Sequence, residues 1–455
     1  MSDKITLPRI MIAAPHSGAG KTTVAMGIAS WLAQELSVAP FKVGPDYIDP
    51  GYLSAGAGVP AVNLDGWLMP RATLTEMFFD HCGLADIAII EGVMGVFDGH
   101  GSSESGSSAE IAAWLKIPVI LVVDASRTGR SVAALVRGFK DFDPCIDIAG
   151  VFLNKIGGAS HLNIARAAVE DLAGVPVVGH LTRDDGFSSP SRHLGLVQLG
   201  ADELKVLAAR LGRSIGANCD RELLMNIAGA AGEVSVTRNA LWPKARRAVK
   251  IGVARDEAFS FYYPDNLRLL EKLGAGIVYF SPIEDKALPA GIDGLFFGGG
   301  WPELHVKSLS ANLAMRQSVG AAAAKGLPIY AECGGLIYLT ESLSVDGQVW
   351  PLVGLLPATS RLTQKRQGLG YRQARFERRT ILGDKDLAVR GHEFHWSTVE
   401  RKSREDYDRA YTYSDGASEG FASDNILASY LHINWRGQPE LAVNFINSCV
   451  EGAYG

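Results

Sequence analysis

Long hydrophobic runs are absent from this chain of 455 residues, and no uninterrupted apolar stretch reaches the roughly 18 residues that a membrane helix needs. The first ten residues, MSDKITLPRI, also lack the apolar core of a signal peptide. Cysteine is scarce, and its five residues are scattered without paired spacing, at Cys82, Cys145, Cys219, Cys333 and Cys449. These absences argue against a disulfide framework, predict a cytoplasmic protein and leave room for one reactive thiol.

An excess of positive charge is also absent, because 44 lysines and arginines face 49 aspartates and glutamates, which gives a net charge of −5. That balance argues against nucleic-acid binding driven by bulk charge. The hydrophobic share of 47% and the charged share of 20% are ordinary for a globular enzyme, so disorder is not expected. We expect neither nucleic acid nor a membrane as a partner, and the length predicts two or three domains.

The first half of the chain alternates short apolar runs with segments of helical periodicity, which predicts a parallel sheet covered on both faces. The predicted strands are RIMIAA, IAIIEGV, VILVVD, IAGVFLN and VPVVGHL. A second α/β pattern begins at VKIGVARD and continues to ILASYLHINW. We therefore predict an α/β protein with one domain over residues 1–225, a linker over 226–247 and a second domain over 248–455.

The stretch PHSGAGKTT follows the first predicted strand and precedes an alanine-rich helix, which is the context of a phosphate-binding loop. Glycines let the backbone N–H groups turn toward phosphate oxygens, and Lys21 would reach the β- and γ-phosphates. Pro15 stands where the usual pattern has its first glycine, which only starts the turn. We predict a P-loop NTPase-like domain that binds ATP through Ser17, Gly18, Ala19, Gly20, Lys21, Thr22 and Thr23. The alternative is a glycine-rich turn in an unrelated α/β protein.

Four acidic residues follow two other predicted strands: Asp46 and Asp49 in FKVGPDYIDPGY, and Glu91 and Asp98 in IIEGVMGVFDG. The carboxyl ends of parallel strands share one edge of the sheet with the phosphate loop. Mg²⁺ takes a few carboxylates together with phosphate oxygens, so we expect Thr22, Asp46 and Glu91 to bind it. The alternative is that these acids cap helices or lie in solvated turns.

Two further polar residues are weaker candidates in the same domain. Asn154 follows the predicted strand IAGVFL and could read a base edge through its amide, or could simply form a turn. Lys42 could neutralise a phosphate or a carboxylate substrate, or could be a surface lysine.

In the second domain, the stretch LPIYAECGGLIYL places Cys333 between an apolar strand and a predicted helix. A nucleophile on such a sharp turn projects into solvent, and the N-terminus of the following helix would lower the pKa of the thiol. His432, at the end of the strand ILASYL, could act as its base. The alternative is that Cys333 is a packing residue.

Backbone N–H groups for an oxyanion are expected from two glycine-rich segments, and the candidate donors are Gly299, Gly300 and Gly334. Class I glutaminases usually carry Glu two positions after the catalytic histidine, and here that position is Asn434. We favour a Cys–His dyad and leave open that Asn434 orients the imidazole. The stretch RGHEFHWS contains His392, Glu393 and His395, but its histidines are three residues apart on a predicted strand, so a structural or substrate-lining role is favoured over a metal site.

Taken together, the order and spacing of these motifs resemble the cobyrinate a,c-diamide synthase family over nearly the whole chain. The motifs are SGAGKTT, FKVGPDYIDPGY, NLDGWLM, IEGVMGVFDG, RHLGL, GGGWPELH, YAECGG, RGHEFHWS and SYLHINW. The first domain is also similar to dethiobiotin synthetase, whose phosphate loop likewise departs from the standard glycine pattern. In SSPSRHLGL, Ser191 stands where relatives often have Glu, and Arg192 and His193 remain candidates for binding a carboxylate.

The resemblance implies an ATP-binding amide-ligase domain joined to a class I glutamine amidotransferase-like α/β domain. It implies that Cys333 attacks glutamine, that His432 moves the proton, and that ammonia passes to the first domain. There ATP and Mg²⁺ would activate the a and c carboxylates of a corrinoid-type tetrapyrrole as acyl phosphates, with Lys42, Asp49 and Asp98 near the reacting groups. A second copy of the chain is a further candidate partner.

Two other functions stay open at this point. The same chemistry could act on hydrogenobyrinate or nickel sirohydrochlorin, because the macrocycle pocket cannot be read from one sequence. The chain could instead be a partition or scaffold ATPase of the deviant Walker type, although His16 takes the place of the signature lysine that such ATPases carry.

Overall fold

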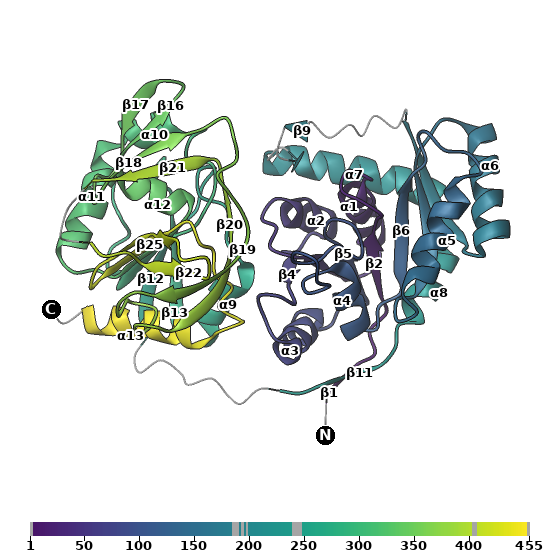
Figure 1. Ribbon diagram of the computed structural model, residues 1–455, viewed down its shortest axis with the longest axis horizontal. Coiled ribbons are helices and arrows are strands. Elements are labelled where there is room, and N and C mark those ends of the chain that lie inside the picture. Colours follow the sequence, from purple (N-terminus) through teal and green to yellow (C-terminus); the bar gives the residue numbers. More distant parts are fainter. Residues whose placement is uncertain are drawn as a thin grey trace. The chain divides into compact units, whose positions relative to one another are not determined.

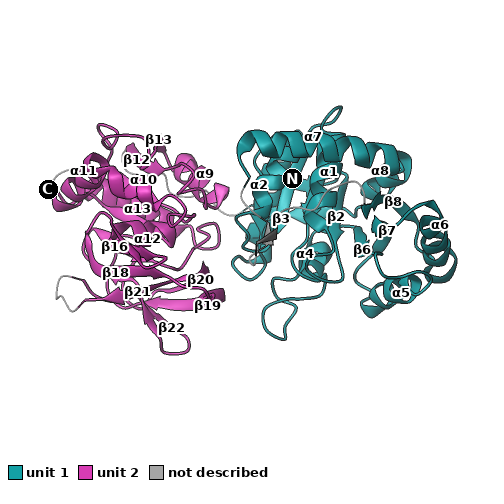
Figure 2. Ribbon diagram, turned by 90° about the horizontal axis from the view of Figure 1, so that it is seen from above, with its two compact units in different colours: residues 1–239 teal, residues 240–455 magenta. Residues whose placement is uncertain are grey.

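The computed structural model describes residues 3–183, 191–192, 195–196, 199–238, 248–402 and 407–452. The chain forms two compact units, Met1–Asn239 and Ala240–Gly455 (Figures 1 and 2). The expected linker at 226–247 began too early. Residues 227 and 228 are buried in the first unit, and the strand β11 (Val234–Val236) pairs with β1 (Asp3–Ile5). In the described part of the chain, no helix is long and apolar enough to cross a membrane.

The first unit contains a seven-stranded sheet in which every neighbouring pair is parallel, in the order β4-β3-β5-β2-β6-β7-β8. This arrangement confirms the parallel sheet predicted from the apolar runs. The strands are β2 (Arg9–Ala13), β3 (Val38–Val43), β4 (Val62–Leu64), β5 (Ile87–Glu91), β6 (Val119–Asp124), β7 (Ile148–Ile156) and β8 (Val177–Thr182).

Helices cover both faces of this sheet because successive strand side chains point to opposite sides. In β2, Ile10 and Ile12 pack with one set of helices, and Met11 and Ala13 pack with the other. The first set is α1 (Lys21–Leu32), α2 (Asp49–Ala57), α7 (Ala201–Asn218) and α8 (Arg221–Gly229). The second set is α3 (Arg71–Cys82), α4 (Ser108–Trp114), α5 (Val132–Phe142) and α6 (Ala159–Ala168), which continues into the π-helical turn Val169–Ala173. The short strands β9 (Ser191–Arg192) and β10 (Gly195–Leu196) pair with each other.

The second unit is built on a six-stranded sheet in the order β13-β12-β14-β15-β25-β24, which is parallel except for the last pair. Its strands are β12 (Val249–Ala254), β13 (Ala275–Phe280), β14 (Gly294–Phe297), β15 (Ile329–Glu332), β24 (Phe421–Ala422) and β25 (Ile426–Ser429). Its helices are α9 (Pro264–Lys272), α10 (Val306–Ala311), α11 (Leu313–Ala324), α12 (Gly334–Leu339) and α13 (Glu440–Gly452). This is the second α/β pattern predicted from residue 248 onward.

Two four-stranded sheets between residues 340 and 419 were not predicted from the sequence. One has the order β17-β16-β18-β21 and the other β20-β19-β22-β23. Their strands are β16 (Thr340–Val345), β17 (Gln348–Pro351), β18 (Leu356–Leu362), β19 (Gly368–Phe376), β20 (Ala388–His395), β21 (Ser397–Arg401), β22 (Tyr411–Tyr413) and β23 (Ser418–Glu419). Residues Phe376, Val389 and Tyr411 of the second sheet pack on the same core as α9 and α13.

Candidate functional sites

The phosphate loop lies between β2 and α1, as the sequence predicts. Residues 17–20 form the turn, and Lys21, Thr22 and Thr23 open the helix. Gly18 and Gly20 have φ of +83° and +101°, in the left-handed region that favours glycine. A Cβ built on Gly20 would lie 2.1 Å from Nδ2 of Asn154, so this position has no room for a side chain.

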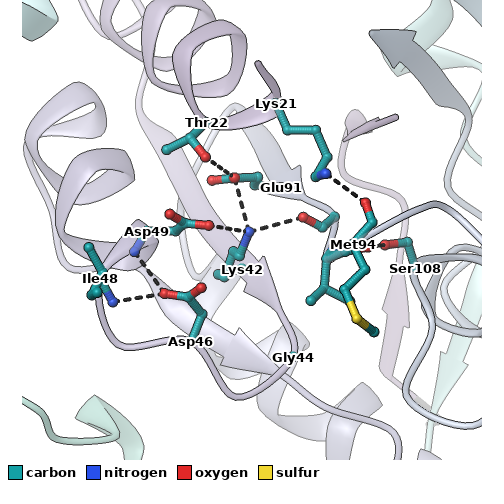
Figure 3. A network of polar contacts seen from close by, with 12 residues as sticks. Lys21, Thr22, Lys42, Gly44, Asp46, Ile48, Asp49, Glu91, Met94 and Ser108 are labelled. Carbon is teal, nitrogen blue, oxygen red and sulfur yellow. Dashed lines mark hydrogen bonds and ion pairs between the residues drawn. The ribbon is translucent and has the colours of Figure 1, made fainter. Parts of the chain in front are cut away.

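A buried network of charges lies beside the loop (Figure 3). The hydroxyl of Thr22 donates to Oε1 of Glu91 at 2.6 Å, and the ammonium of Lys42 contacts the same oxygen at 2.9 Å. Lys42 also donates to the carbonyl of Gly92 at 3.0 Å and forms an ion pair with Asp49 at 2.7 Å. Thr22, Lys42, Asp49 and Glu91 thus form one cluster, although they come from four separate elements.

Burial and charge set the protonation of this cluster. Lys42 is 2% exposed and Glu91 is fully buried. Burial alone would lower the pKa of Lys42, but the carboxylates of Asp49 and Glu91 together raise it above its ordinary value. Burial raises the pKa of Glu91 to about 7, and Lys42 opposes that rise. Burial, followed by the charge of Lys42, lowers the pKa of Lys21 to about 8. The alternative of a surface lysine at position 42 is wrong.

Asp46 is engaged in a local turn, because its Oδ1 accepts the N–H groups of Ile48 and Asp49, both at 2.8 Å. A turn of this kind was part of the alternative given above for these acids. Asp98 likewise accepts the N–H of Gly95 at 2.9 Å. No cluster of three or more His, Cys, Asp or Glu side chains suited to a metal was found among the described residues. The assignment of Asp46 to a metal therefore stays a prediction.

Asn154 lies near the end of β7 and forms a hydrogen bond with the phosphate loop. Its Nδ2 donates to the carbonyl of Ala19 at 2.8 Å, and its Oδ1 accepts the N–H of Lys155 at 2.9 Å. Contact with a base stays a prediction for this residue. Of the two candidates for binding a carboxylate, Arg192 lies in β9, and His193 lies outside the described residues.

The predicted sharp turn at Cys333 is present in the second unit. Cys333 follows β15, precedes α12 and has φ of 46°, which is strained for a residue with a side chain. Its N–H donates to the carbonyl of Ser429 at 2.7 Å, and its thiol contacts the carbonyl of Phe394 at 3.7 Å. A Cβ built on Gly334 would lie 3.0 Å from the nitrogen of Gly300, so the turn packs directly on the glycine loop.

That glycine loop differs from expectation in one respect. The N–H of Gly299 donates to the carbonyl of Phe261 at 3.1 Å, so it is already used and is not directed at an oxyanion. Gly300 and Gly334 remain the candidate donors. Gly299 instead makes room for the histidine, because a Cβ there would lie 2.5 Å from Cε1 of His432 and 3.1 Å from its Nε2.

His432 follows β25 and is 1% exposed. Its Nδ1 lies 3.3 Å from Oε2 of Glu332, which is equally buried. Asn434 makes a different contact, since its Oδ1 accepts the N–H of Arg436 at 3.0 Å. The sequence interpretation missed Glu332. A signal was available, because Glu332 ends an apolar strand just as Glu91 does, and an unpaired carboxylate there would be costly.

The pKa of the Cys333 thiol runs against the sequence prediction. Burial, followed by the charge of Glu303, raises it above its ordinary value, and the N–H of Gly334 only partly opposes this. The helix that follows Cys333 is only six residues long, and the lowering of the thiol pKa expected from it is smaller than the rise caused by burial and Glu303. Cys333 is 6% exposed, so it does not project into solvent as predicted. It lines a cavity of about 30 Å³ together with Glu303, Phe394 and Trp396. The thiol is therefore protonated at neutral pH and needs a base.

The stretch RGHEFHWS forms the end of β20 and continues into β21, so the strand predicted there is correct. The backbone of His392 pairs with that of His432 through two hydrogen bonds of 2.9 Å. Glu393 forms an ion pair with Arg372 at 2.8 Å, and His395 stacks on Tyr430 with ring centroids 3.6 Å apart. His395 also lines the cavity of Cys333. His392 and Glu393 thus hold neighbouring segments of the fold together, and His395 lines the cavity.

Comparison with known proteins identifies the family. Residues 10–197 match the CobQ/CobB/MinD/ParA nucleotide binding domain, and residues 250–439 match the CobB/CobQ-like glutamine amidotransferase domain. A cobyrinate a,c-diamide synthase from Dehalococcoides mccartyi is 43% identical over 97% of this chain and 98% of its own. The chain belongs to the cobyrinate a,c-diamide synthase family. A second relative of that name, from Leptospira interrogans, is 40% identical over 98% of this chain and 99% of its own.

Family membership supports the two domain types at the level of fold. The nucleotide-binding match covers the seven-stranded sheet and the phosphate loop, and the amidotransferase match covers Cys333 and His432. Among solved structures, a glutamine amidotransferase from Thermotoga maritima aligns with 46% of this chain and 86% of its own. Its sequence identity to this chain is 13%, and its TM-score is 0.30.

Proposed function

We propose that this chain is an ATP- and glutamine-dependent ligase that converts the a and c side-chain carboxylates of cobyrinate to amides in cobalamin biosynthesis. The observation that supports this most strongly is a phosphate loop and a strained, cavity-lining cysteine in one chain, with whole-length similarity to proteins named for that reaction.

The second unit would release ammonia from glutamine. His432 would take the proton of Cys333, and the thiolate would attack the side-chain amide carbon of glutamine. The N–H groups of Gly300 and Gly334 would stabilise the oxyanion. The imidazolium would then return its proton to the leaving nitrogen, and water would hydrolyse the thioester to glutamate. Because the cavity at Cys333 measures about 30 Å³ and holds only one or two waters, glutamine must widen it by moving side chains.

Glu303 is a candidate for holding the substrate in that cavity. Its carboxyl lines the cavity together with Cys333, and desolvation raises its pKa to about 7. The α-ammonium of glutamine would restore the charged carboxylate, since an opposite charge at close range favours the ionised form.

The first unit would activate the carboxylate. Loop N–H groups and Lys21 would hold the triphosphate of ATP while a carboxylate oxygen of the macrocycle attacks the γ-phosphorus and ADP leaves. Ammonia would then displace phosphate from the acyl phosphate and form the amide. Such a transfer depends on positioning and charge neutralisation, which Lys21, Lys42 and Asp49 would supply beside the loop.

The side chains of Thr22 and Glu91, beside the phosphate loop, are suited to hold Mg²⁺. Oε2 of Glu91 is fully buried without a hydrogen-bond partner among the described residues, and the hydroxyl of Thr22 lies against the other oxygen of that carboxylate. A hard cation with oxygen ligands would satisfy this atom, and Thr22 and Glu91 would hold it. When bound, Mg²⁺ would neutralise phosphate charge during the transfer.

The test is a substrate panel analysed by mass spectrometry. The purified chain is incubated with ATP, Mg²⁺ and glutamine and with cobyrinate, hydrogenobyrinate or nickel sirohydrochlorin. We expect two carboxyl-to-amide conversions on cobyrinate, and the other two macrocycles identify a related ligase if they react instead. If none is amidated, the proposed function is wrong. Absence of glutamate release from glutamine would instead favour a scaffold ATPase.

A further inference from the structure

The buried contact between Glu332 and His432 has no counterpart in the usual order of class I glutaminase motifs. There the acid follows the histidine by two positions, and here Asn434 occupies that place. The oxygen of Asn434 is taken by the N–H of Arg436. The residue beside the imidazole is Glu332, which directly precedes the nucleophile in sequence.

Strand geometry explains how one dipeptide supplies both groups. Successive side chains of a strand point to opposite faces. Ala331 and Cys333 pack on the face of β15 that carries α10 and α11, whereas Tyr330 packs on the face that carries α9 and α13. Glu332 follows Tyr330 onto that second face, because the Tyr330 hydroxyl donates to its Oε1 at 2.6 Å. The carboxylate therefore lies behind the turn and does not occupy the cavity.

The carboxylate is held rigidly in that position. Its Oε1 also accepts the N–H of Ile433 at 3.1 Å, and Ile433 is the residue after His432. Its Oε2 faces Nδ1 of His432 at 3.3 Å. The opposite edge of the imidazole, with Nε2, lies against Gly299 next to the loop that packs on the cysteine turn. Nδ1 and Nε2 therefore face different partners.

We propose that Glu332 is the positioning residue of His432, taking the part that an acid after the histidine plays in other class I glutaminases. By accepting a hydrogen bond from Nδ1–H, Glu332 fixes the tautomer in which Nε2 carries no proton and can take the thiol proton of Cys333. Once Nε2 is protonated, the buried carboxylate stabilises the imidazolium. This stabilisation matters because burial keeps the thiol protonated until a base acts.

Other titratable groups around His432 do not supply the negative charge. His392, on β20, is paired with it through the backbone and has a pKa lowered to about 3 by burial and then by the charge of His432. The pKa of His395 is also lowered, chiefly by burial. Both histidines are neutral near pH 7. Glu393 is paired with Arg372 at 2.8 Å.

The inference rests on the proposed function, and the test separates the two. Glutamate release and ammonia-dependent amidation are measured for the full chain as wild type, Glu332→Gln, Glu332→Asp and Asn434→Ala. For Glu332→Gln we expect kcat of glutamate release to fall at least about 100-fold, with KM for glutamine within about threefold. Its ammonia-dependent rate should match wild type. Glu332→Asp should recover part of the loss, and Asn434→Ala should stay within about threefold.

A pH profile distinguishes positioning from packing. Removing the carboxylate takes away the negative charge that stabilises the imidazolium, so the acid limb of kcat/KM should move to lower pH in Glu332→Gln. Glu332→Asp keeps the charge and should keep the limb. The inference is overturned if Glu332→Gln retains wild-type glutaminase, or if the Gln and Asp variants lose glutamine- and ammonia-dependent activity equally. A wild type that releases no glutamate would sink the proposed function instead.

Discussion

The two units bury their charged groups in opposite ways. In the first unit, Lys42 lies between the carboxylates of Asp49 and Glu91, and these two charges keep the buried lysine ionised. In the second unit, burial, followed by the charge of Glu303, raises the pKa of the Cys333 thiol, which stays protonated. A site that binds a polyanion gains from side chains that stay charged. A thiol beside buried acids becomes a nucleophile only when its base removes the proton.

The comparison also shows the cost of each arrangement. A buried ion cluster is stable only while all its members are present, since removing one leaves an uncompensated charge. A neutral buried thiol carries no such cost, but its reaction depends on the histidine and on whatever stabilises the imidazolium. Substitutions in the ion cluster of the first unit are thus expected to lower the free energy of unfolding, and substitutions around Cys333 in the second unit to lower the reaction rate.

The largest expected effect tests whether the two centres are separable. In Cys333→Ser, glutamine-dependent amidation should fall by at least about 1,000-fold, because the nucleophile is lost. The ammonia-dependent rate should stay within about twofold, since the phosphate loop lies in the other unit. Both rates are measured by amide formation on cobyrinate. Loss of the two activities together would contradict the separation.

A second prediction sharpens the contrast in stability. Lys42→Met removes the cation between two buried carboxylates and should cost about 3 kcal/mol. That corresponds to a fall of roughly 6 to 12 °C in the melting temperature of a unit of this size. The matched control is Lys155→Met, whose ion pair with Asp124 has a lysine side chain that is 42% exposed. The control should cost less than about 1 kcal/mol. If calorimetry gives Lys42→Met and Lys155→Met the same melting temperature, Lys42 does not neutralise the buried carboxylates as described.

A third prediction concerns the acid stability of the second unit. His392 has a pKa of about 3 when folded, against about 6.5 when unfolded. Between these values the unfolded chain binds a proton at His392 that the folded chain does not bind. The contribution of His392 to the free energy of unfolding is therefore fully present above pH 6.5 and is lost as the pH drops toward 3. From about pH 7.5 to about 5.0 the wild type should lose about 2 kcal/mol more than His392→Gln in denaturant titrations. Parallel losses in the two proteins would rule out His392 as the cause.

The smallest expected effect concerns the acid in the cavity. Glu303→Gln removes the charge proposed to meet the α-ammonium of glutamine, so KM for glutamine should rise about tenfold. Its kcat should change less than about threefold, and ammonia-dependent amidation should not change. Steady-state glutamate release gives both constants. A fall in kcat with KM unchanged would mean that Glu303 acts on the reaction step and not on binding.

Much of the fold followed from local pattern. The runs IAIIEGV and VILVVD predicted β5 and β6 because strands buried on both faces must be apolar throughout. The loop SGAGKTT was recognisable because Gly18 and Gly20 adopt positive φ, and the turn AECGG because its two glycines leave no room for a side chain. Most strands between residues 340 and 423 were missed, apart from the one at RGHEFHWS, since they are half exposed and no single run stands out.

The sequence by itself determined most strands of the two largest sheets and the turns that bear a phosphate-binding lysine or a nucleophile, because these depend on neighbours along the chain. Only the tertiary structure decided which side chains meet. It placed Lys42 against Glu91, brought Glu332 to His432 and turned Asn434 to Arg436. These contacts join residues up to 100 positions apart. They depend on strand order and register, which no local pattern specifies.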